Sequence, residues 1–367
     1  MASDGREAAG SFVFDLAMQL SECLPVRVVA PGEVDGVEIL NSRLNVFRYR
    51  APGKALSQLG FRRPRELMSI LSVLWRGRRA AASAVAAGPT GNVLALWAFP
   101  SGLWARAACA KTGLPYSVWT LGSDIWVLGK IPLVRSYVAR ILRGAAFRYS
   151  DGLQLASDTS LLAGRETTFL PSTRDIGPAA TRAANHDAPY SLLFLGRWHP
   201  NKGIDLLLDA LALLDDDAWT RISLVHIAGG GPLQQRVEAG VRLLCEAGRP
   251  VRLSGYLDKA NARAAIEDAD MLLIPSRIES IPVVFSDAMK LGRPVVAMPV
   301  GDLPALVARY SCGVVAGDVS ARAFADALAH TVDGSITGLV AGTANAAEQF
   351  SLPRICDRLL SDIEAAA

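Results

Sequence analysis

Two carboxylates, Glu279 and Asp287, stand eight positions apart in a mostly apolar stretch of the chain. The apolar run that ends at Pro275 predicts a strand before them, and Ala288–Leu291 predicts a helix after them. Glu279 then lies in a loop at the carboxyl end of a strand, which is where open α/β sheets bind ligands. Free N–H groups at a helix start favour an anion. Carboxylates for hydroxyl groups, next to amides for phosphate, indicate a sugar-nucleotide site.

Two cations lie in an earlier loop between a predicted strand and a predicted helix. Arg197 and Lys202 fall within residues 196–203, after the predicted strand Ser191–Leu195. Two fixed cations offset the negative charge that grows on a departing diphosphate. The alternative is a surface Arg and a helix-start Lys, but a cation at a helix N-terminus opposes the helix dipole. We therefore assign both side chains to the ligand.

Length and composition bound the class of protein. The chain has 367 residues, enough for two domains, and is 51% hydrophobic and 20% charged, which fits a globular α/β protein rather than a disordered one. Its five cysteines are scattered and form no Cys-x-x-Cys pair, so neither a disulfide framework nor a zinc site is indicated. The polar start of the chain lacks the apolar core of a signal peptide, and we expect a cytoplasmic protein.

The net charge of +3 conceals an asymmetry. Residues 1–185 contain 22 basic and 13 acidic residues, a balance of +9, whereas residues 186–367 contain 16 and 22, a balance of −6. Within residues 61–79, arginines flank apolar residues at helical spacing, namely Leu67, Ile70, Leu71, Leu74 and Trp75. Such a helix is typical of an anchor on an anionic membrane surface, and a core-packed helix is the alternative. No nucleic-acid recognition motif accompanies the charge, so we expect no nucleic-acid partner.

Strand and helix patterns alternate along both halves, which favours two doubly wound α/β domains. We predict an N-terminal domain over 1–175, a linker over 176–189, a C-terminal domain over 190–345, and a helix over 346–367 that could return to the first domain. The predicted strands are Val26–Pro31, Val93–Trp97, Tyr116–Leu121, Ser191–Leu195, Ile222–Ala228, Val251–Leu253, Met271–Ile274 and Val295–Ala297.

Four features of the second half occur in a fixed order. They are the loop 196–203, the run Ala228–Pro232, Gly255–Leu257 with Asp270 and Pro275-Ser276 after it, and the stretch from Glu279 to Gly301. Together they resemble family 4 of the retaining glycosyltransferases (glycosyl transferases group 1), which have the GT-B fold of two Rossmann-like domains. The resemblance covers residues 191 to about 330 well. It extends into the first half through 10–13, 100–102 and 122–125.

The resemblance implies roles for individual residues. Arg197 and Lys202 match the cations that hold the donor diphosphate, and Glu279 matches the carboxylate that contacts sugar hydroxyls. Asp287 matches the ribose-binding position, where the family usually has Glu. The alternative is that Asp287 is an acid favoured near a helix N-terminus by the helix dipole. Asp124 is the candidate for acceptor contact, with a structural turn as the alternative. The implied donor-binding residues are Gly10, Gly196, Gly230, Ser280, Ile281, Val283, Val284 and Asp287.

No metal or cofactor is expected. Two Asp-rich runs, 215–217 and 268–270, look like metal-binding motifs, but Asp270 leads directly into a predicted strand and the other run follows a helix. Enzymes of the resembled family generally need no metal, because cationic side chains and helix ends stabilise the leaving group. The nucleotide-diphosphate sugar is then a substrate and not a cofactor.

The chain departs from the family in the first half. Leu121 stands where relatives often carry His, and all four histidines lie beyond the predicted linker. The family also begins with a strand ahead of the loop that Gly10 and Ser11 represent, so we expect a first domain that lacks its first strand, or a longer protein. Losing that strand would expose the edges of its neighbours.

These observations predict a retaining glycosyltransferase that moves a sugar from a nucleotide-diphosphate donor to a glycan or lipid-linked acceptor. Cell-surface polysaccharide biosynthesis at the inner face of the membrane is the expected setting. One alternative is a catalytically impaired homologue that binds donor as a partner subunit. A nicotinamide-dependent dehydrogenase is the weakest alternative, because no Gly-x-Gly-x-x-Gly follows a strand.

Overall fold

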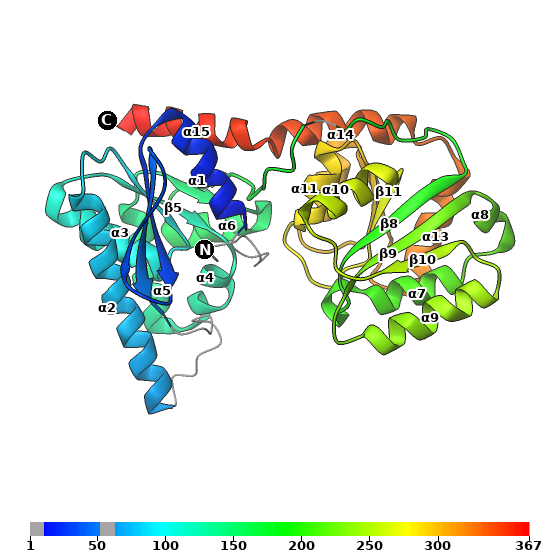
Figure 1. Cartoon of the computed structure of the whole chain (residues 1–367), viewed down its shortest axis with the longest axis horizontal. Coiled ribbons are helices and arrows are strands. Elements are labelled where there is room, and N and C mark those ends of the chain that lie inside the picture. Colours follow the sequence, from blue (N-terminus) through cyan, green and yellow to red (C-terminus); the bar gives the residue numbers. More distant parts are fainter. Residues whose placement is uncertain (1–10, 52–62, 179, 367) are drawn as a thin grey trace. The chain divides into compact units, whose positions relative to one another are not determined.

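The computed structural model describes residues 11–51, 63–178 and 180–366, and these fall into two compact units. Unit 1 contains the chain up to Asp175 and again from Leu352 onward, and unit 2 contains Ile176–Ser351. In Figure 1, unit 1 runs from blue to green and includes the red helix α15 (Leu352–Ala366), while unit 2 runs from green to orange. Both units are α/β, as the alternation of patterns predicted.

Unit 1 holds two sheets. The first has the order β1-β3-β2, with β1 (Val26–Gly32) parallel and β2 (Gly36–Asn41) antiparallel to β3 (Leu44–Arg50). The second is all parallel with the order β4-β5-β6-β7, made of Val93–Leu96, Tyr116–Thr120, Arg148–Ser150 and Thr168–Phe169. Among the described residues, β1 and β4 each have a ladder on one side only. Strands β1, β4 and β5 lie where the sequence predicted strands, but β2, β3, β6 and β7 had not been predicted.

Eight helical segments cover the two sheets in the described part of unit 1. They are α1 (Ser11–Cys23), α2 (Pro64–Ala86), α3 (Ser101–Thr112), α4 (Ser123–Trp126), the 3₁₀ turn η2 (Leu128–Lys130), α5 (Pro132–Gly144), α6 (Leu153–Ala163) and α15. Helix α15 packs against α1, and its residues Leu352 and Ile355 share a core cluster with Trp119. The Tyr149 hydroxyl donates to Asp362 Oδ2 at 2.8 Å, which ties α15 to β6.

Helix α2 differs from the single apolar stripe that the sequence predicted. Ile70 and Val73 are buried in unit 1, whereas Leu67, Leu71 and Trp75 are exposed. A Cβ at Gly77 would lie 2.3 Å from the ring of Trp104 on α3, so the two helices pack closely at this point. The helix therefore packs on the core with one face and leaves a second apolar face uncovered. Residues 61 and 62 of the predicted membrane anchor lie outside the described residues.

Unit 2 is built on one parallel sheet of six strands with the order β10-β9-β8-β11-β12-β13. Its strands are β8 (Tyr190–Arg197), β9 (Ile222–Gly230), β10 (Val251–Ser254), β11 (Met271–Ile274), β12 (Val295–Ala297) and β13 (Gly313–Val315). Its helices are η3 (Pro200–Lys202), α7 (Ile204–Ala212), α8 (Asp216–Thr220), α9 (Gln234–Glu246), α10 (Lys259–Asp268), α11 (Val283–Lys290), α12 (Leu303–Tyr310), α13 (Ala321–Asp333) and α14 (Thr337–Gln349). All five strands predicted for this half are confirmed.

The direction of winding reverses in the middle of this sheet. From β8 the chain moves outward through β9 to β10, and it then crosses back to β11 and moves outward on the other side through β12 to β13. The switch point lies between β8 and β11, which are paired in parallel. Ligands of open α/β sheets bind at the carboxyl ends of the strands at such a point.

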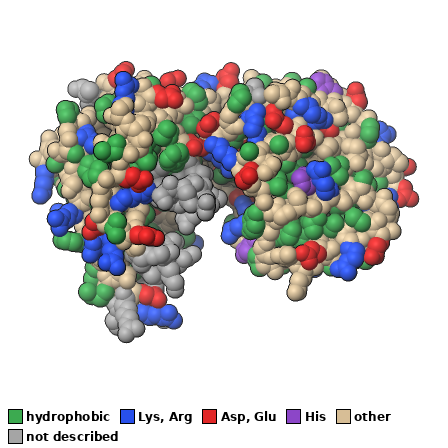
Figure 2. Space-filling view, viewed as in Figure 1, with side chains coloured by type: hydrophobic (Ala, Val, Ile, Leu, Met, Phe, Trp, Pro, Cys, Tyr) green, Lys and Arg blue, Asp and Glu red, His purple; other side chains and the backbone are tan. Residues whose placement is uncertain are grey.

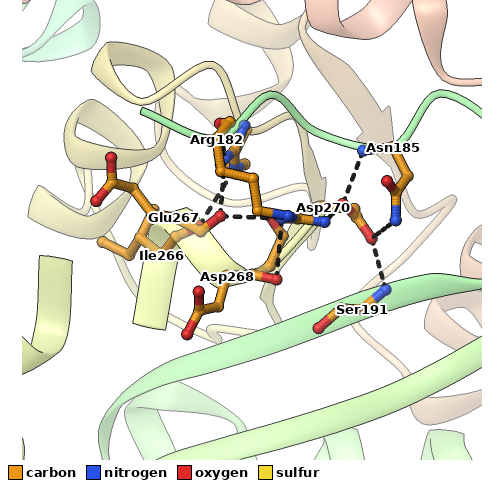
Figure 3. Close-up of polar contacts among 9 residues, drawn as sticks. Arg182, Asn185, Ser191, Ile266, Glu267, Asp268 and Asp270 are labelled. Atoms are coloured by element: carbon orange, nitrogen blue, oxygen red, sulfur yellow. Dashed lines mark hydrogen bonds and ion pairs between the residues drawn. The ribbon is translucent and has the colours of Figure 1, made fainter. Parts of the chain in front are cut away.

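The segment that enters β8 is held on unit 2 by a buried ionic network (Figure 3). Asp270 is fully buried, and it accepts hydrogen bonds from Arg182 Nη2 at 2.7 Å, Asn185 N at 2.8 Å and Ser191 N at 2.8 Å. The buried Arg293 donates to the carbonyl oxygens of Arg182 and Glu267. Asp270 is therefore occupied by structural hydrogen bonds, as its position at the start of a strand had suggested. Within the described ranges, no helix is both long and apolar enough to cross a membrane.

Candidate functional site

The site begins with the two loops that leave the sheet on either side of the switch point. Strand β8 ends at Arg197 and β11 ends at Ile274, so both loops emerge at the same edge of the sheet. They touch at Gly203, whose φ is +67° and where a Cβ would lie 1.8 Å from the Pro275 carbonyl oxygen. Glycine is required there, because any side chain would collide with backbone. This contact fixes the loop after β8 against the loop after β11.

Lys202 and Glu279 meet across these loops. The Lys202 ammonium forms an ion pair with Glu279 Oε1, although the residues are 77 positions apart in the chain. Ser276 Oγ also donates to Glu279 Oε1, at 3.1 Å. Both charged side chains are largely but not fully buried, so a ligand can still reach them. The fold thus brings together the cation and the carboxylate that the sequence predicted for one site.

A second ion pair, which the sequence analysis missed, holds the same two loops. Arg277 donates to both carboxylate oxygens of Asp205, each at 2.7 Å, and its backbone N–H donates to the Asn201 carbonyl oxygen at 2.8 Å. Hydrogen bonding by Arg277 lowers the pKa of Asp205 below its ordinary value. In the sequence, Asp205 follows Lys202 by three positions and Arg277 precedes Glu279 by two, so the two ion pairs are neighbours along both segments. We call this pair the Arg277–Asp205 clamp.

The first turn of α11 presents backbone amides beside Glu279. Pro282 is the N-cap and supplies no side-chain cap. In the described part of the chain, no acceptor takes the N–H groups of Ile281, Val283 or Val284. Gly301 supports the loop, because a Cβ there would lie 2.1 Å from the Glu279 carbonyl oxygen. These amides carry the partial positive charge of a helix N-terminus and suit an anion.

Two further residues that were predicted for the donor site, Arg197 and Ser280, have polar side chains with unused hydrogen-bonding capacity. Arg197 is exposed, and its guanidinium has no hydrogen-bond or ion-pair partner within the described residues. Ser280 Oγ is buried, and it too lacks a partner among them. Gly196 pairs with Gly229 at the end of the β8–β9 ladder. Gly10 lies outside the described residues.

The glycine run at the end of β9 is used for packing. A Cβ at Gly229 would lie 1.9 Å from the Gly196 carbonyl oxygen, and one at Gly230 would lie 2.6 Å from the Tyr256 ring. Trp198 N and the Tyr256 hydroxyl both donate to the Gly230 carbonyl oxygen, at 2.8 Å and 2.7 Å. The Cβ side of Gly230 is therefore covered by an aromatic ring. This favours the turn role over the donor-binding role for Gly230.

Asp287 occupies a different environment from the one that the resemblance implied. Its side chain is 0% exposed, and Lys290 Nζ lies 3.6 Å from its Oδ1. Its ribose role stays a prediction, and the observed burial favours the structural alternative.

Asp124 is likewise 0% exposed. Its Oδ2 accepts from Ala98 N at 2.6 Å and its Oδ1 from Leu121 N at 3.3 Å, so it joins the loop after β4 to the loop after β5. Burial raises the pKa of Asp124, and the backbone hydrogen bonds oppose that shift. Both oxygens hold the turn together, which favours the structural alternative, and the acceptor role of Asp124 stays a prediction.

Metal-ligand clusters are missing from the described ranges, where no three His, Cys, Asp or Glu side chains lie close enough to hold an ion. Asp215 caps α8 by accepting from Ala218 N at 2.9 Å, and Asp270 belongs to the network of Figure 3. The Asp-rich runs therefore have structural roles in these positions.

Comparison with known proteins agrees with this geometry. Residues 189–333 match the family described as Glycosyl transferases group 1. A D-inositol 3-phosphate glycosyltransferase of Corynebacterium aurimucosum is 33% identical over 163 residues, which is 43% of this chain and 39% of that protein. The chain spans less than half the length of the curated relatives that it matches.

Solved structures extend the likeness over the whole chain. The apo lipopolysaccharide outer core galactosyltransferase WaaB has a TM-score of 0.69 at 15% identity and covers 100% of this chain and 98% of its own. Anabaena HepE in complex with UDP has a TM-score of 0.66 at 15% identity and covers 98% and 96%. Residues 189–333 are therefore similar to the glycosyl transferases group 1 family, and the chain as a whole has the GT-B fold with its two Rossmann-like units.

Proposed function

We propose that the chain is a retaining glycosyltransferase that moves a sugar from a nucleoside-diphosphate donor to a glycan or lipid-linked acceptor. The observation that carries this proposal is the Lys202–Glu279 pair at the switch point, beside the α11 amides that have no acceptor among the described residues. The bound UDP of HepE supports a nucleotide donor. The names of the WaaB and Corynebacterium relatives support a surface-glycan or phosphorylated acceptor in polysaccharide biosynthesis.

The proposed reaction breaks the bond between the sugar C1 and the diphosphate oxygen. The acceptor hydroxyl oxygen forms the new bond to C1 on the same face, and its proton passes to the departing phosphate oxygen. Lys202, Arg197 and the first-turn amides of α11 offset the negative charge that develops on the diphosphate. Glu279 accepts hydrogen bonds from sugar hydroxyls and fixes the ring. This set of groups supplies the charge stabilisation without a resident metal or cofactor.

The test is release of nucleoside diphosphate from a panel of UDP- and GDP-sugars, with and without a chelator, and the anomer of the product by NMR. Lys202→Ala and Glu279→Ala should each lower kcat by about 10²–10³. Arg242→Ala, at an exposed position of α9, is the matched control and should turn over like wild type. Full turnover in both site variants would remove the assignment. Donor-dependent stabilisation without any release would instead support the impaired binding homologue.

We also propose a peripheral location at the cytoplasmic face of a membrane. The uncovered face of α2 carries Leu67, Met68, Leu71 and Trp75, and the Arg79 guanidinium lies 5.7 Å from the centroid of the Trp75 ring. Figure 2 shows Lys and Arg side chains around α2 on the visible face of unit 1. Apolar side chains beside arginines fit the interface of an anionic bilayer.

A further inference from the structure

Unit 1 has a second basic surface, which contains no residue of the donor site. Residues 125–150 include five basic residues and no Asp or Glu. Most of this segment is α5, together with the strand that follows it. A stretch of this length without a carboxylate carries an uncompensated positive charge, and the neighbouring elements decide where that charge faces.

Helix α5 divides its side chains sharply between core and solvent. Val138, Ile141 and Leu142 are fully buried in the core of unit 1. Leu133 and Tyr137, two turns and one turn nearer the start of the helix than Ile141, are 79% and 50% exposed. A single exposed Leu is common on protein surfaces, so Leu133 is informative only together with the charged and apolar groups near it.

A cavity of about 390 Å³ lies beside this exposed face, between α5 and the end of α6. Its lining residues are Arg135, Ser136, Ala139, Arg140, Arg143, Leu161 and Leu162. The three arginines that line it form no ion pair with any described residue, and no described carboxylate lines the cavity. Leu161, at its rim, is 81% exposed. Three guanidinium groups around an open cavity create a site for an anion that the protein itself does not supply.

Arginine and exposed apolar side chains alternate over this region. The Arg140 guanidinium lies 5.6 Å from the centroid of the Tyr137 ring, which holds its charge beside an apolar, amphipathic side chain. Guanidinium groups match phosphate oxygens in pairs, whereas Leu and Tyr favour the boundary between water and hydrocarbon. A soluble anion would use the arginines but would leave Leu133 and Leu161 in water.

We propose that the α5–α6 surface, formed by Leu133, Arg135, Tyr137, Arg140, Arg143 and Leu161, binds the phosphate head groups of an anionic phospholipid bilayer. The cavity takes a head-group phosphate between the arginines, and the exposed leucines enter the acyl boundary. The inference rests on the peripheral location proposed above, but it assigns the lipid phosphate to α5 and α6 instead of α2. The two assignments can therefore fail separately.

The test is co-sedimentation of the full chain with phosphatidylcholine vesicles, with and without phosphatidylglycerol. Wild type should bind the anionic vesicles in a salt-dependent manner. The triple variant Arg135→Gln, Arg140→Gln, Arg143→Gln should bind on the order of 100-fold more weakly. Each Arg near an anionic surface adds a similar amount to the free energy of binding, and the variant removes three of them. The control triple Arg242→Gln, Arg309→Gln, Arg322→Gln removes the same charge from unit 2 and should retain binding. Leu133→Ser with Leu161→Ser should weaken binding without any change of charge.

Three results would overturn the inference. One is equal binding by the α5 triple variant and the control triple variant. Another is loss of binding in Trp75→Ser together with full binding by the α5 triple variant, which would leave only α2 as the anchor. The third is complete displacement of vesicles by millimolar inorganic phosphate or glycerol phosphate, which would make the cavity a site for soluble phosphate compounds. Unchanged far-UV circular dichroism and donor-dependent turnover would establish that each variant is folded.

Discussion

Each of the two units contains an all-parallel sheet, but the units differ in how their loops are held. In unit 2 one continuous sheet of six strands brings the loops after β8 and β11 together, and backbone contacts at Gly203 and Gly301 fix them. In unit 1 the described strands form two separate sheets, and the turn after β5 is held by the buried carboxylate of Asp124. Unit 2 thus leaves its charged groups accessible to a ligand, whereas unit 1 uses its carboxylate internally.

The free charge of the two units differs in the same way. In unit 2 the Lys202 ammonium is already paired with the Glu279 carboxylate, so the charged groups of the proposed donor site are in place before a ligand binds. In unit 1 the exposed arginines of α5 have no counter-ion among the described residues, and exposed apolar side chains lie next to them. The difference is the basis for the two proposals, in which unit 2 binds a small donor molecule and unit 1 contacts an extended anionic surface.

The largest effect should come from the backbone contact that fixes the loops of unit 2. Gly203 and Gly113 have similar positive φ angles, +67° and +72°, but only Gly203 has backbone within reach of a Cβ. Gly113→Ala should cost about 1–2 kcal/mol of unfolding free energy for the left-handed conformation alone. Gly203→Ala should cost about 3–5 kcal/mol, because the collision with Pro275 adds to that strain. Urea unfolding measures both, and equal losses would contradict the special role of this contact.

A smaller effect on the free energy of unfolding should distinguish the carboxylate of Asp124 from that of Glu279. Asp124→Ala should lower the free energy of unfolding by about 1–3 kcal/mol, because the buried N–H groups of Ala98 and Leu121 lose their acceptor. Glu279→Ala should change it by only about 0.5 kcal/mol while lowering the kcat of donor turnover by about 10²–10³. The measurements are thermal or urea unfolding together with nucleoside diphosphate release. A fully stable Asp124→Ala protein with impaired acceptor use would restore the acceptor role of Asp124.

The sequence predicted unit 2 better than unit 1 for a physical reason. Buried parallel strands such as Met271–Ile274 are short apolar runs with glycine or proline after them, and such runs are recognisable without tertiary information. Strand β2 (Gly36–Asn41) is largely exposed and lacks that pattern, so it was missed with its partner β3. Likewise, Leu67 and Ile70 share helical spacing, and only the tertiary packing of α2 on α3, β3 and β1 decides that one is exposed and the other buried.

At the site, residue types were predictable but their accessibility was not. Lys202 and Glu279 could be paired from motif order alone, and the structure places them in contact. The burial of Asp287 depends on how the first turns of α11 pack, which no local pattern encodes. The Arg277–Asp205 clamp was missed because neither residue belongs to a recognisable motif. Its only sequence signal is an Asp in the first turn of a helix, and such residues are common for dipole reasons.

The clamp provides the smallest and most specific effect. Because Arg277 lowers the pKa of Asp205, the clamp's contribution to stability is fully present above the unfolded-state pKa of about 3.9 and is lost as the pH falls through the lower folded-state pKa. Asp205→Asn should therefore lower the free energy of unfolding by about 0.5–1 kcal/mol at neutral pH, and the deficit should shrink in acid. The matched control is Asp209→Asn. Asp209 lies on α7 like Asp205, and its exposed ion pair is with Arg236 on α9. Urea unfolding from neutral to acidic pH measures both variants. Two results would contradict the role of charge in the clamp: a stability deficit of Asp205→Asn that persists in strong acid, or the same pH dependence in Asp209→Asn. The clamp would then hold the loops by packing and neutral hydrogen bonds, and its contrast with the backbone contact at Gly203 would disappear.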